Sequence, residues 1–281
     1  WDEYKYGKDA GDAQNFTDMN GYIQSQSQAK DLVRFYYTDK EAMFDAVSYN
    51  KGGRILHMLR NFVGDSAFFK SLNLYLTTNK YKSAEAHQLR LAFEEITGKD
   101  LNWFFNQWYF GSGHPKLTID YVYDDASKKV NVIVKQTQPG KVFKLPIAVD
   151  IYNGAKKVRH QVWVENSADT FAFSYDSRPD LVNVDGDKVL LAEKKDNKTL
   201  DNFIHQYKYA GNYLDRKESI DAAARKQDDA AALDLLKIAM KDNYHGLRSY
   251  TISKLDMKKE NVRKEVEPIL ADIVRNDVKR T

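Results

Sequence analysis

The sequence predicts a multidomain α and β protein, in which a helical part, an antiparallel β-sandwich and a second helical part follow one another. Apolar residues recur with helical spacing up to about residue 110 and again after about residue 200. Between these two parts they alternate with polar residues, as in half-buried strands. We therefore expect a helical part over residues 1–112, a β-sandwich over 113–194 and a helical region over 195–281.

The first part is predicted to contain helices only. Gly64 is placed to end one helix, and Ser83 to cap another that has Glu85 in its first turn and ends at Gly98. Asp100 is placed to cap the next helix. The apolar stripes of these helices are Ile55, Leu56, Met58, Leu59, Phe62 and Val63, then Phe68, Leu72, Tyr75 and Leu76, then Leu89, Ala92, Phe93 and Ile96, and finally Leu101, Phe104, Phe105 and Trp108.

The run from Gly111 to Pro115 breaks the helical spacing, and strands are predicted after it. Asn153-Gly154 is a strong signal for a two-residue hairpin turn. The polar run from Lys194 to Lys198 is interpreted as a linker. The alternating apolar residues are Leu117, Ile119, Tyr121 and Tyr123, then Val130, Val132 and Val134, then Leu145, Ile147, Val149 and Ile151, then Val158, Val162 and Val164, and finally Phe171, Phe173 and Tyr175.

Short helices joined by turns are predicted for the last part, as in stacked helical-repeat pairs of the HEAT kind. Only two or three such pairs fit, so we expect a truncated array. The last residues, 276–281, continue a helical pattern without a stop signal. The apolar stripes are Phe203, Ile204 and Tyr207, then Leu233, Leu236 and Met240, then Leu247, Thr251, Ile252 and Leu255.

Composition excludes several classes of function. The formal net charge of +3 comes from 43 basic and 40 acidic residues, so nothing favours nucleic acid as a partner. The chain has no cysteine, which removes disulfides and cysteine metal ligands, and it has no apolar run of the roughly 20 residues that span a bilayer. The chain opens at Trp1 with neither an initiator methionine nor a signal peptide, and we expect both ends to be cuts within a longer protein.

The residues alone predict no complete catalytic site. A helical zinc peptidase motif needs two histidines one turn apart, so that both imidazoles face one metal ion. The nearest two histidines of this chain are 27 residues apart, and each is interpreted as a packing or surface residue. The six histidines are His57, His87, His114, His160, His205 and His245.

Several segments, in order, carry a resemblance to a known family. Tyr49-Asn50-Lys51-Gly52 resembles the Y-x-K-G segment of the gluzincin zinc aminopeptidases of the aminopeptidase N type. Residues 1–9 resemble the stretch after its third zinc ligand, and residues 65–75 resemble the helix that follows Y-x-K-G. The run from Phe104 to Trp108 resembles its F-x-x-W segment, and Gly113-His114-Pro115 resembles its G-H-P entry into the β-sandwich. The resemblance covers essentially the whole chain.

The resemblance implies that the helical residues 1–112 are the carboxy-terminal part of a thermolysin-like catalytic domain. It implies hydrolysis of amino-terminal residues from peptides, with zinc in the full-length parent and Tyr49 stabilising the tetrahedral oxyanion. Lys51 is interpreted as a solvated or capping charge and Gly52 as a close-packing glycine. The zinc ligands and general base are absent from this sequence, so we expect no catalytic metal and no activity from this chain alone.

Two other interpretations stay open. The chain could be a non-catalytic interaction scaffold related to this family, or a carbohydrate-binding sandwich with helical flanks. Peptide substrates and the missing amino-terminal half are the expected partners of the enzymatic interpretation, together with self-association through an exposed apolar face. The resemblance to bacterial envelope members suggests the periplasm or cell surface.

Overall fold

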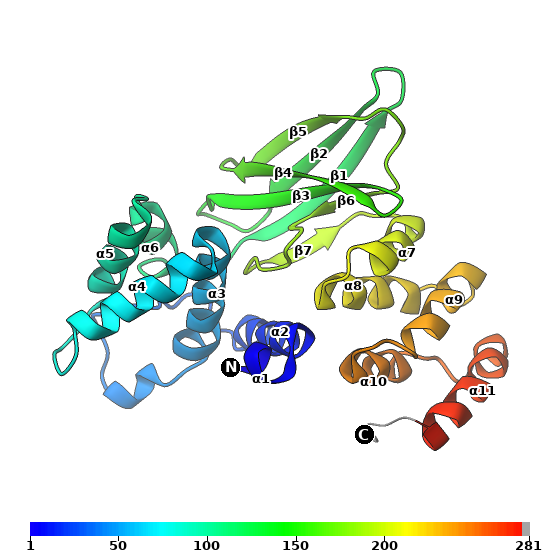
Figure 1. Ribbon diagram of the computed structural model, residues 1–281, viewed down its shortest axis with the longest axis horizontal. Coiled ribbons are helices and arrows are strands. Elements are labelled where there is room, and N and C mark those ends of the chain that lie inside the picture. Colours follow the sequence, from blue (N-terminus) through cyan, green and yellow to red (C-terminus); the bar gives the residue numbers. More distant parts are fainter. Residues whose placement is uncertain (277–281) are drawn as a thin grey trace.

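The computed structural model describes residues 1–276, and the first part of the chain forms helices (Figure 1). Within residues 1–115, all of them described, no strand is present, as predicted. A short 3-10 turn and a π-helical turn precede the third α-helix. The elements are α1 (Asp2–Tyr6), α2 (Lys8–Gln24), η1 (Lys40–Met43), η2 (Val47–Lys51), α3 (Gly52–Val63), α4 (Asp65–Thr78), α5 (Ala86–Thr97) and α6 (Asn102–Trp108).

The helix ends follow local capping chemistry, with two corrections at N-caps. Gly64 ends α3 with a φ of 83° and Gly98 ends α5 with a φ of 65°, as predicted. The prediction that Ser83 caps α5 is wrong, because Glu85 occupies the N-cap and forms a reciprocal capping box with Gln88. The prediction that Asp100 caps α6 is also wrong, because Leu101 occupies the N-cap without a side-chain hydrogen bond, although the carboxylate of Asp100 accepts the backbone N–H of Asn102, the first residue of the helix, at 2.8 Å.

Seven strands form two small sheets. The four-stranded sheet has the order β5-β2-β1-β7 and the three-stranded sheet has the order β4-β3-β6. Most neighbours are antiparallel, but β7 pairs with β1 in parallel, with Leu117 opposite Lys194. The strands are β1 (Lys116–Asp124), β2 (Lys129–Gln136), β3 (Leu145–Asn153), β4 (Lys156–Val164), β5 (Ala168–Ser174), β6 (Leu181–Val184) and β7 (Glu193–Asp196).

Two predictions about the sheets need correction. The run from Lys194 to Lys198 is not simply a linker, because its first residues belong to β7 and satisfy the edge of β1. The hairpin between β3 and β4 exists, but Asn153 pairs with Lys156, so the turn residues are Gly154 and Ala155. Gly154 has a φ of 56° and Ala155 has a negative φ, as in a type II′ turn.

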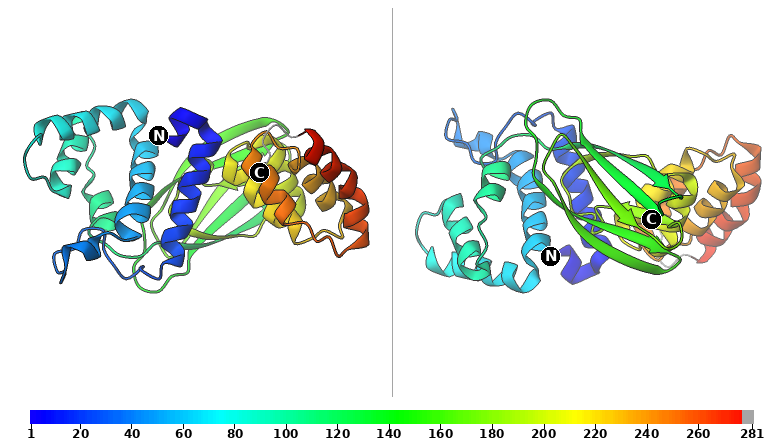
Figure 2. Two further views of the ribbon diagram at one scale, coloured as in Figure 1. Left: turned by 90° about the horizontal axis from the view of Figure 1, so that it is seen from below. Right: turned by 90° about the horizontal axis from the view of Figure 1, so that it is seen from above.

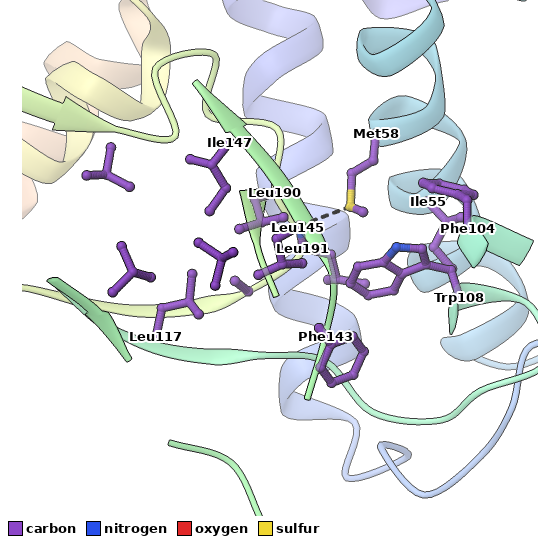
Figure 3. Close-up of a cluster of buried hydrophobic side chains, with 14 of the residues drawn as sticks. Ile55, Met58, Phe104, Trp108, Leu117, Phe143, Leu145, Ile147, Leu190 and Leu191 are labelled. Atoms are coloured by element: carbon purple, nitrogen blue, oxygen red, sulfur yellow. Dashed lines mark hydrogen bonds between the residues drawn. The ribbon is translucent and has the colours of Figure 1, made fainter. Parts of the chain in front are cut away.

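One hydrophobic core runs through the first helical part and both sheets (Figure 3). Met58 from α3 and Trp108 from α6 meet Phe143, Leu145 and Leu191 from the sheet region. Strand β3 is buried along almost its whole length, because one face meets the other sheet and the other face meets helices. This shared core fixes the position of α3, which carries the candidate site at its start.

The last part of the chain is helical, and Figure 2 shows it at the opposite end of the molecule from α4 and α5. Two smaller cores hold it, one among α7 to α10 and one between α9 and α11. Among residues 1–276, no helix is both long and apolar enough to cross a membrane. The predicted helical continuation over residues 277–281 lies outside the described residues. The helices are α7 (Leu200–Tyr209), α8 (Tyr213–Ala224), α9 (Ala230–Ala239), α10 (His245–Ser253) and α11 (Glu260–Asn276).

Candidate active site around Tyr49

Tyr49 lies in the π-helical turn η2, directly before α3. The carbonyl of Ala46 accepts the backbone N–H of Lys51 at 2.9 Å, five residues further along the chain. The N–H of Gly52 reaches back to the carbonyl of Val47 in the same way. This wider turn projects Tyr49 outward, and its side chain is 62% exposed. Single π-helical turns occur frequently at functional sites.

Asp45 holds the start of this turn. Its carboxylate accepts the backbone N–H groups of Val47 at 3.1 Å and Ser48 at 3.0 Å, and the guanidinium of Arg34 at 2.6 and 3.1 Å. Burial raises the pKa of Asp45, but the hydrogen bonds from Arg34, Ser48 and Lys30 outweigh it and hold this pKa well below its usual range. Asp45 is therefore ionised at neutral pH and fixes the turn.

The other side of the turn packs against α2. Val47 is fully buried, and the side-chain amide of Asn50 donates to Asp18 at 3.4 Å. Gly21 of α2 leaves the room for this amide, since a Cβ at position 21 would lie 2.9 Å from Asn50 Nδ2. Gly52 also lies close to the loop that follows α2. A Cβ added at Gly52 would lie 3.4 Å from Leu32 Cδ1, which agrees with the predicted close packing.

Lys51 is buried, so the prediction that it is solvated is wrong. It is 0% exposed, its Nζ donates to the carbonyl of Gly111 at 3.0 Å, and this nitrogen lies 5.8 Å from the ring centroid of Tyr22. Desolvation lowers the pKa of Lys51 to about 8, against an opposing effect of Asp31. The capping interpretation holds, but the capped carbonyl belongs to a segment 60 residues away.

A buried polar chain continues from this point to β7. The hydroxyl of Tyr22 lies 3.4 Å from His114 Nδ1, and His114 Nε2 lies 3.0 Å from the carboxylate of Glu193. Burial lowers the pKa of His114, although Glu193 opposes this shift, so the imidazole is neutral at pH 7. The turn that carries Tyr49 is thereby joined to α2, to the 111–115 segment and to the sheet.

The chemistry that these residues offer is a single exposed phenol on a rigid turn. The ring of Tyr49 lies 6.0 Å from that of Phe44, centroid to centroid. Among residues 1–276, no group of three or more histidine, cysteine, aspartate or glutamate side chains is placed to hold a metal ion. Burial, aided by Arg54, lowers the pKa of His57 to about 4. A catalytic zinc ion therefore does not fit a site built from the described residues.

The sequence patterns did not reveal the residues that hold the turn of Tyr49 in place. Arg34 and Asp45 lie 11 residues apart in a segment without regular periodicity, and Tyr22 and His114 lie 92 residues apart. Only the folded chain brings them together. The one local signal was the Tyr49-Asn50-Lys51-Gly52 segment itself.

Comparison with known proteins assigns the region around the turn to a family. Residues 13–108 match the peptidase family M1 domain. The aminopeptidase N of Lactococcus lactis subsp. lactis is 33% identical over 115 residues, which are 40% of this chain and 13% of that protein. A probable aminopeptidase 2 of Sulfurisphaera tokodaii is 29% identical over 149 residues, which are 52% of this chain and 18% of that protein.

The fold has a counterpart among solved structures. Legionella pneumophila aminopeptidase A, determined in complex with aspartic acid, matches 97% of this chain and 34% of its own with a TM-score of 0.70. The identity of 16% makes this a likeness of fold alone. The matched part of this chain spans less than a fifth of the length of each of the two curated relatives named above. The residues that match the peptidase family M1 domain, 13–108, include the turn of Tyr49, so the candidate site lies in the part of the chain that is similar to aminopeptidases.

Proposed function

We propose that this chain is the carboxy-terminal part of a zinc-dependent aminopeptidase that removes amino-terminal residues from peptides. The observation that carries the proposal is Tyr49, an exposed phenol on a braced turn inside the segment that matches the M1 family. The zinc ion and its ligands would come from the part of the parent that this sequence does not contain. When bound, zinc would polarise the scissile carbonyl.

Tyr49 would donate a hydrogen bond to the oxyanion of the tetrahedral intermediate. A phenol hydroxyl is a neutral donor, and a preorganised donor costs no reorganisation at the moment of reaction. Asp45, Lys51 and Asn50 hold the backbone of the turn from three sides and supply this preorganisation. They are positioning residues, since their contacts are to the turn and its neighbours.

The test is Tyr49→Phe in the full-length parent enzyme. Loss of one oxyanion donor lowers kcat by about 100- to 1000-fold. We expect KM and zinc content to stay near their original values, because the substitution removes only the hydroxyl. Tyr81→Phe is the matched control, since Tyr81 is 94% exposed in the loop between α4 and α5. A kcat that falls less than about fivefold in the Tyr49 variant, or equally in both, contradicts the assigned role.

The arrangement of parts belongs to the same proposal. Residues 1–112 would complete a thermolysin-like catalytic domain, residues 113–194 a β-sandwich, and residues 195–281 would begin a HEAT-like array. The packing of α7 on α8 and of α8 on α9 supports the last of these. A periplasmic or cell-envelope location rests on resemblance, and fractionation of cells that express the parent tests it.

The missing half of the catalytic domain would cover the face beside Tyr49. Phe44, whose ring lies 6.0 Å from that of Tyr49, is more than half exposed, and so are Phe35, Tyr36 and Tyr37, which follow Arg34, one of the residues that support this turn. Large exposed apolar patches mark interaction surfaces or cause association. We expect this chain alone to self-associate through that face, and sedimentation of a clean monomer at high concentration contradicts this expectation.

A further inference from the structure

A cleft separate from the turn of Tyr49 lies between the sheet β4-β3-β6 and the helices α3 and α6. Its volume is about 250 Å³. One wall is the outer face of β3 and β4, where Pro146 pairs with Trp163 and Ala148 with Gln161. The other wall comes from the far end of α3, with Met58 and Phe62. At a helical rise of about 1.5 Å per residue, these two residues lie roughly 14 to 20 Å from Tyr49 along the helix axis.

Three aromatic rings form a rigid side of this cleft. Phe62, Trp103 and Trp163 meet edge to face, with centroids 5.3 to 6.0 Å apart and interplanar angles between 77° and 85°. Each ring fixes the other two, so the surface they present is formed before any ligand arrives. Trp163 is 39% exposed, which leaves this side accessible from solvent.

The floor of the cleft contains one polar donor, the indole N–H of Trp108. Trp108 as a whole is 1% exposed and lines the cleft, but its indole nitrogen is not sealed inside the protein, and no hydrogen bond joins it to another described residue. In Figure 3 the indole nitrogen lies on the edge of the ring that faces Met58 and Phe104, two further lining residues. An indole N–H is a donor only, so at the floor of the cleft it favours a ligand that brings an acceptor in place of water.

The charges at the cleft are already neutralised within the protein. Lys144 pairs with Glu165 at 2.6 Å, Asp185 with Lys194 at 3.0 Å and Asp187 with Arg159 at 2.7 Å. These three are the charged residues that line the cleft. An ionic ligand would have to displace an existing partner, whereas a neutral ligand would not.

Size, surface and polarity together define the ligand. An apolar cavity of about 150 Å³ holds benzene, so 250 Å³ holds an aromatic ring with a small polar group. We propose that this cleft binds a neutral aromatic ring with an adjacent carbonyl, the ring lying against Phe62, Trp103 and Trp163 and the carbonyl accepting from Trp108. An aromatic residue within a peptide and a small aryl amide share this chemistry.

The test uses the 281-residue chain and three small probes. N-acetyl-phenylalaninamide carries both ring and carbonyl, toluene carries the ring alone, and N-acetyl-alaninamide carries the amide alone. Calorimetry or tryptophan fluorescence should give a saturable Kd on the order of 1 mM for the first probe. We expect binding at least fivefold weaker for each of the other two. Equal binding of toluene, or no saturation by the first probe, overturns the proposal.

Two variants locate the binding. Trp108→Phe keeps a ring and removes the N–H, so it should weaken N-acetyl-phenylalaninamide about fivefold while leaving toluene unchanged. Gln161→Trp places a bulky group at the exposed rim and should abolish binding of both. Val158→Trp is the matched control, because Val158 is 60% exposed on the same strand and does not line the cleft.

The variants remain decisive if the buried substitution disturbs folding. Circular dichroism first shows whether each variant is folded. If Trp108→Phe does not fold, the comparison of binding between the exposed variants Gln161→Trp and Val158→Trp tests the proposal. Unchanged binding in Gln161→Trp overturns the proposal. A blocked pentapeptide with a central phenylalanine then separates the two sources: binding as tight as the small probe identifies a peptide, and loss of binding identifies a small aryl amide.

Discussion

Two residues of the same turn, Tyr49 and Lys51, have opposite environments. Side chains two positions apart in a helical turn do not face each other, so one points outward while the other points into the protein. Tyr49 is 62% exposed and Lys51 is fully buried with its ammonium on the carbonyl of Gly111. The exposed residue carries the proposed chemistry and the buried one anchors the turn.

The burial of Lys51 predicts a pH dependence of stability. Its pKa is about 8 in the folded chain against 10.5 for an ordinary lysine, because burial disfavours the charged form. Between these pH values the unfolded chain holds a proton that the folded chain has released, so raising the pH favours folding. This one group should add on the order of 3 kcal/mol to the free energy of unfolding across the window.

Lys51→Met isolates this contribution, since it keeps the apolar stem and removes the titrating group. Urea unfolding at pH 7, 8, 9 and 10 measures the free energy of unfolding of both proteins. We expect the free energy of unfolding of the wild type, relative to that of the variant, to increase as the pH is raised from 7 to 10. A difference that stays constant from pH 7 to 10 means that the lysine titrates as if it were exposed.

At the scale of elements, glycines decide where segments approach closely. Gly111 follows α6, and a Cβ there would lie 2.6 Å from the backbone oxygen of Gln107. Its carbonyl is also the acceptor for Lys51. Gly53 lies in the first turn of α3 and has no atom within 4 Å of its Cβ position. At Gly111 a side chain would clash with the neighbouring backbone, whereas at Gly53 there is room for one.

Gly111→Ala and Gly53→Ala should therefore change stability in opposite directions. The first substitution forces the backbone after α6 to shift and should lower the free energy of unfolding by about 1 to 3 kcal/mol. The second removes unfolded-state freedom in a helix and should raise it by about 0.5 to 1 kcal/mol. Urea unfolding of the two variants side by side measures this. Destabilisation by Gly53→Ala as large as that by Gly111→Ala would show that the close approach is not the cause.

At the scale of the whole molecule, the first helical part and the two sheets share one core, whereas the last helices have small cores of their own. Phe143 lies in the shared core, 2% exposed, with its ring 5.2 Å from that of Trp108. Val262 lies in the core between α9 and α11. We expect the molecule to open in units that follow these cores.

Phe143→Ala should reduce the protection of α6 and β3 together, because it removes about 3 to 5 kcal/mol of packing that both elements share. Hydrogen exchange followed by mass spectrometry reads each element separately. Peptides from α11 should keep their protection in this variant. Val262→Ala is the reciprocal control and should expose α9 and α11 while α6 and β3 stay protected; exposure of all four elements in both variants would show a single cooperative unit.

The sequence by itself determined the elements whose cause is local. Helical spacing identified α3 to α6, alternation identified β1 to β5, and glycines marked the ends of α3 and α5. The segment around Tyr49 pointed to the M1 family for the same reason, since its residues are contiguous. These features depend on neighbours within a few positions, which periodicity and capping describe.

Only the tertiary structure decided the features whose partners are distant in the chain. The polar residues after Ala192 form β7 because the edge of β1, some 77 residues earlier, supplies the hydrogen bonds. Lys51 is buried because the carbonyl of Gly111 and the ring of Tyr22 surround it. Lysine side chains are mostly exposed in proteins, and burial of one is tolerated only when folding brings partners to its ammonium group.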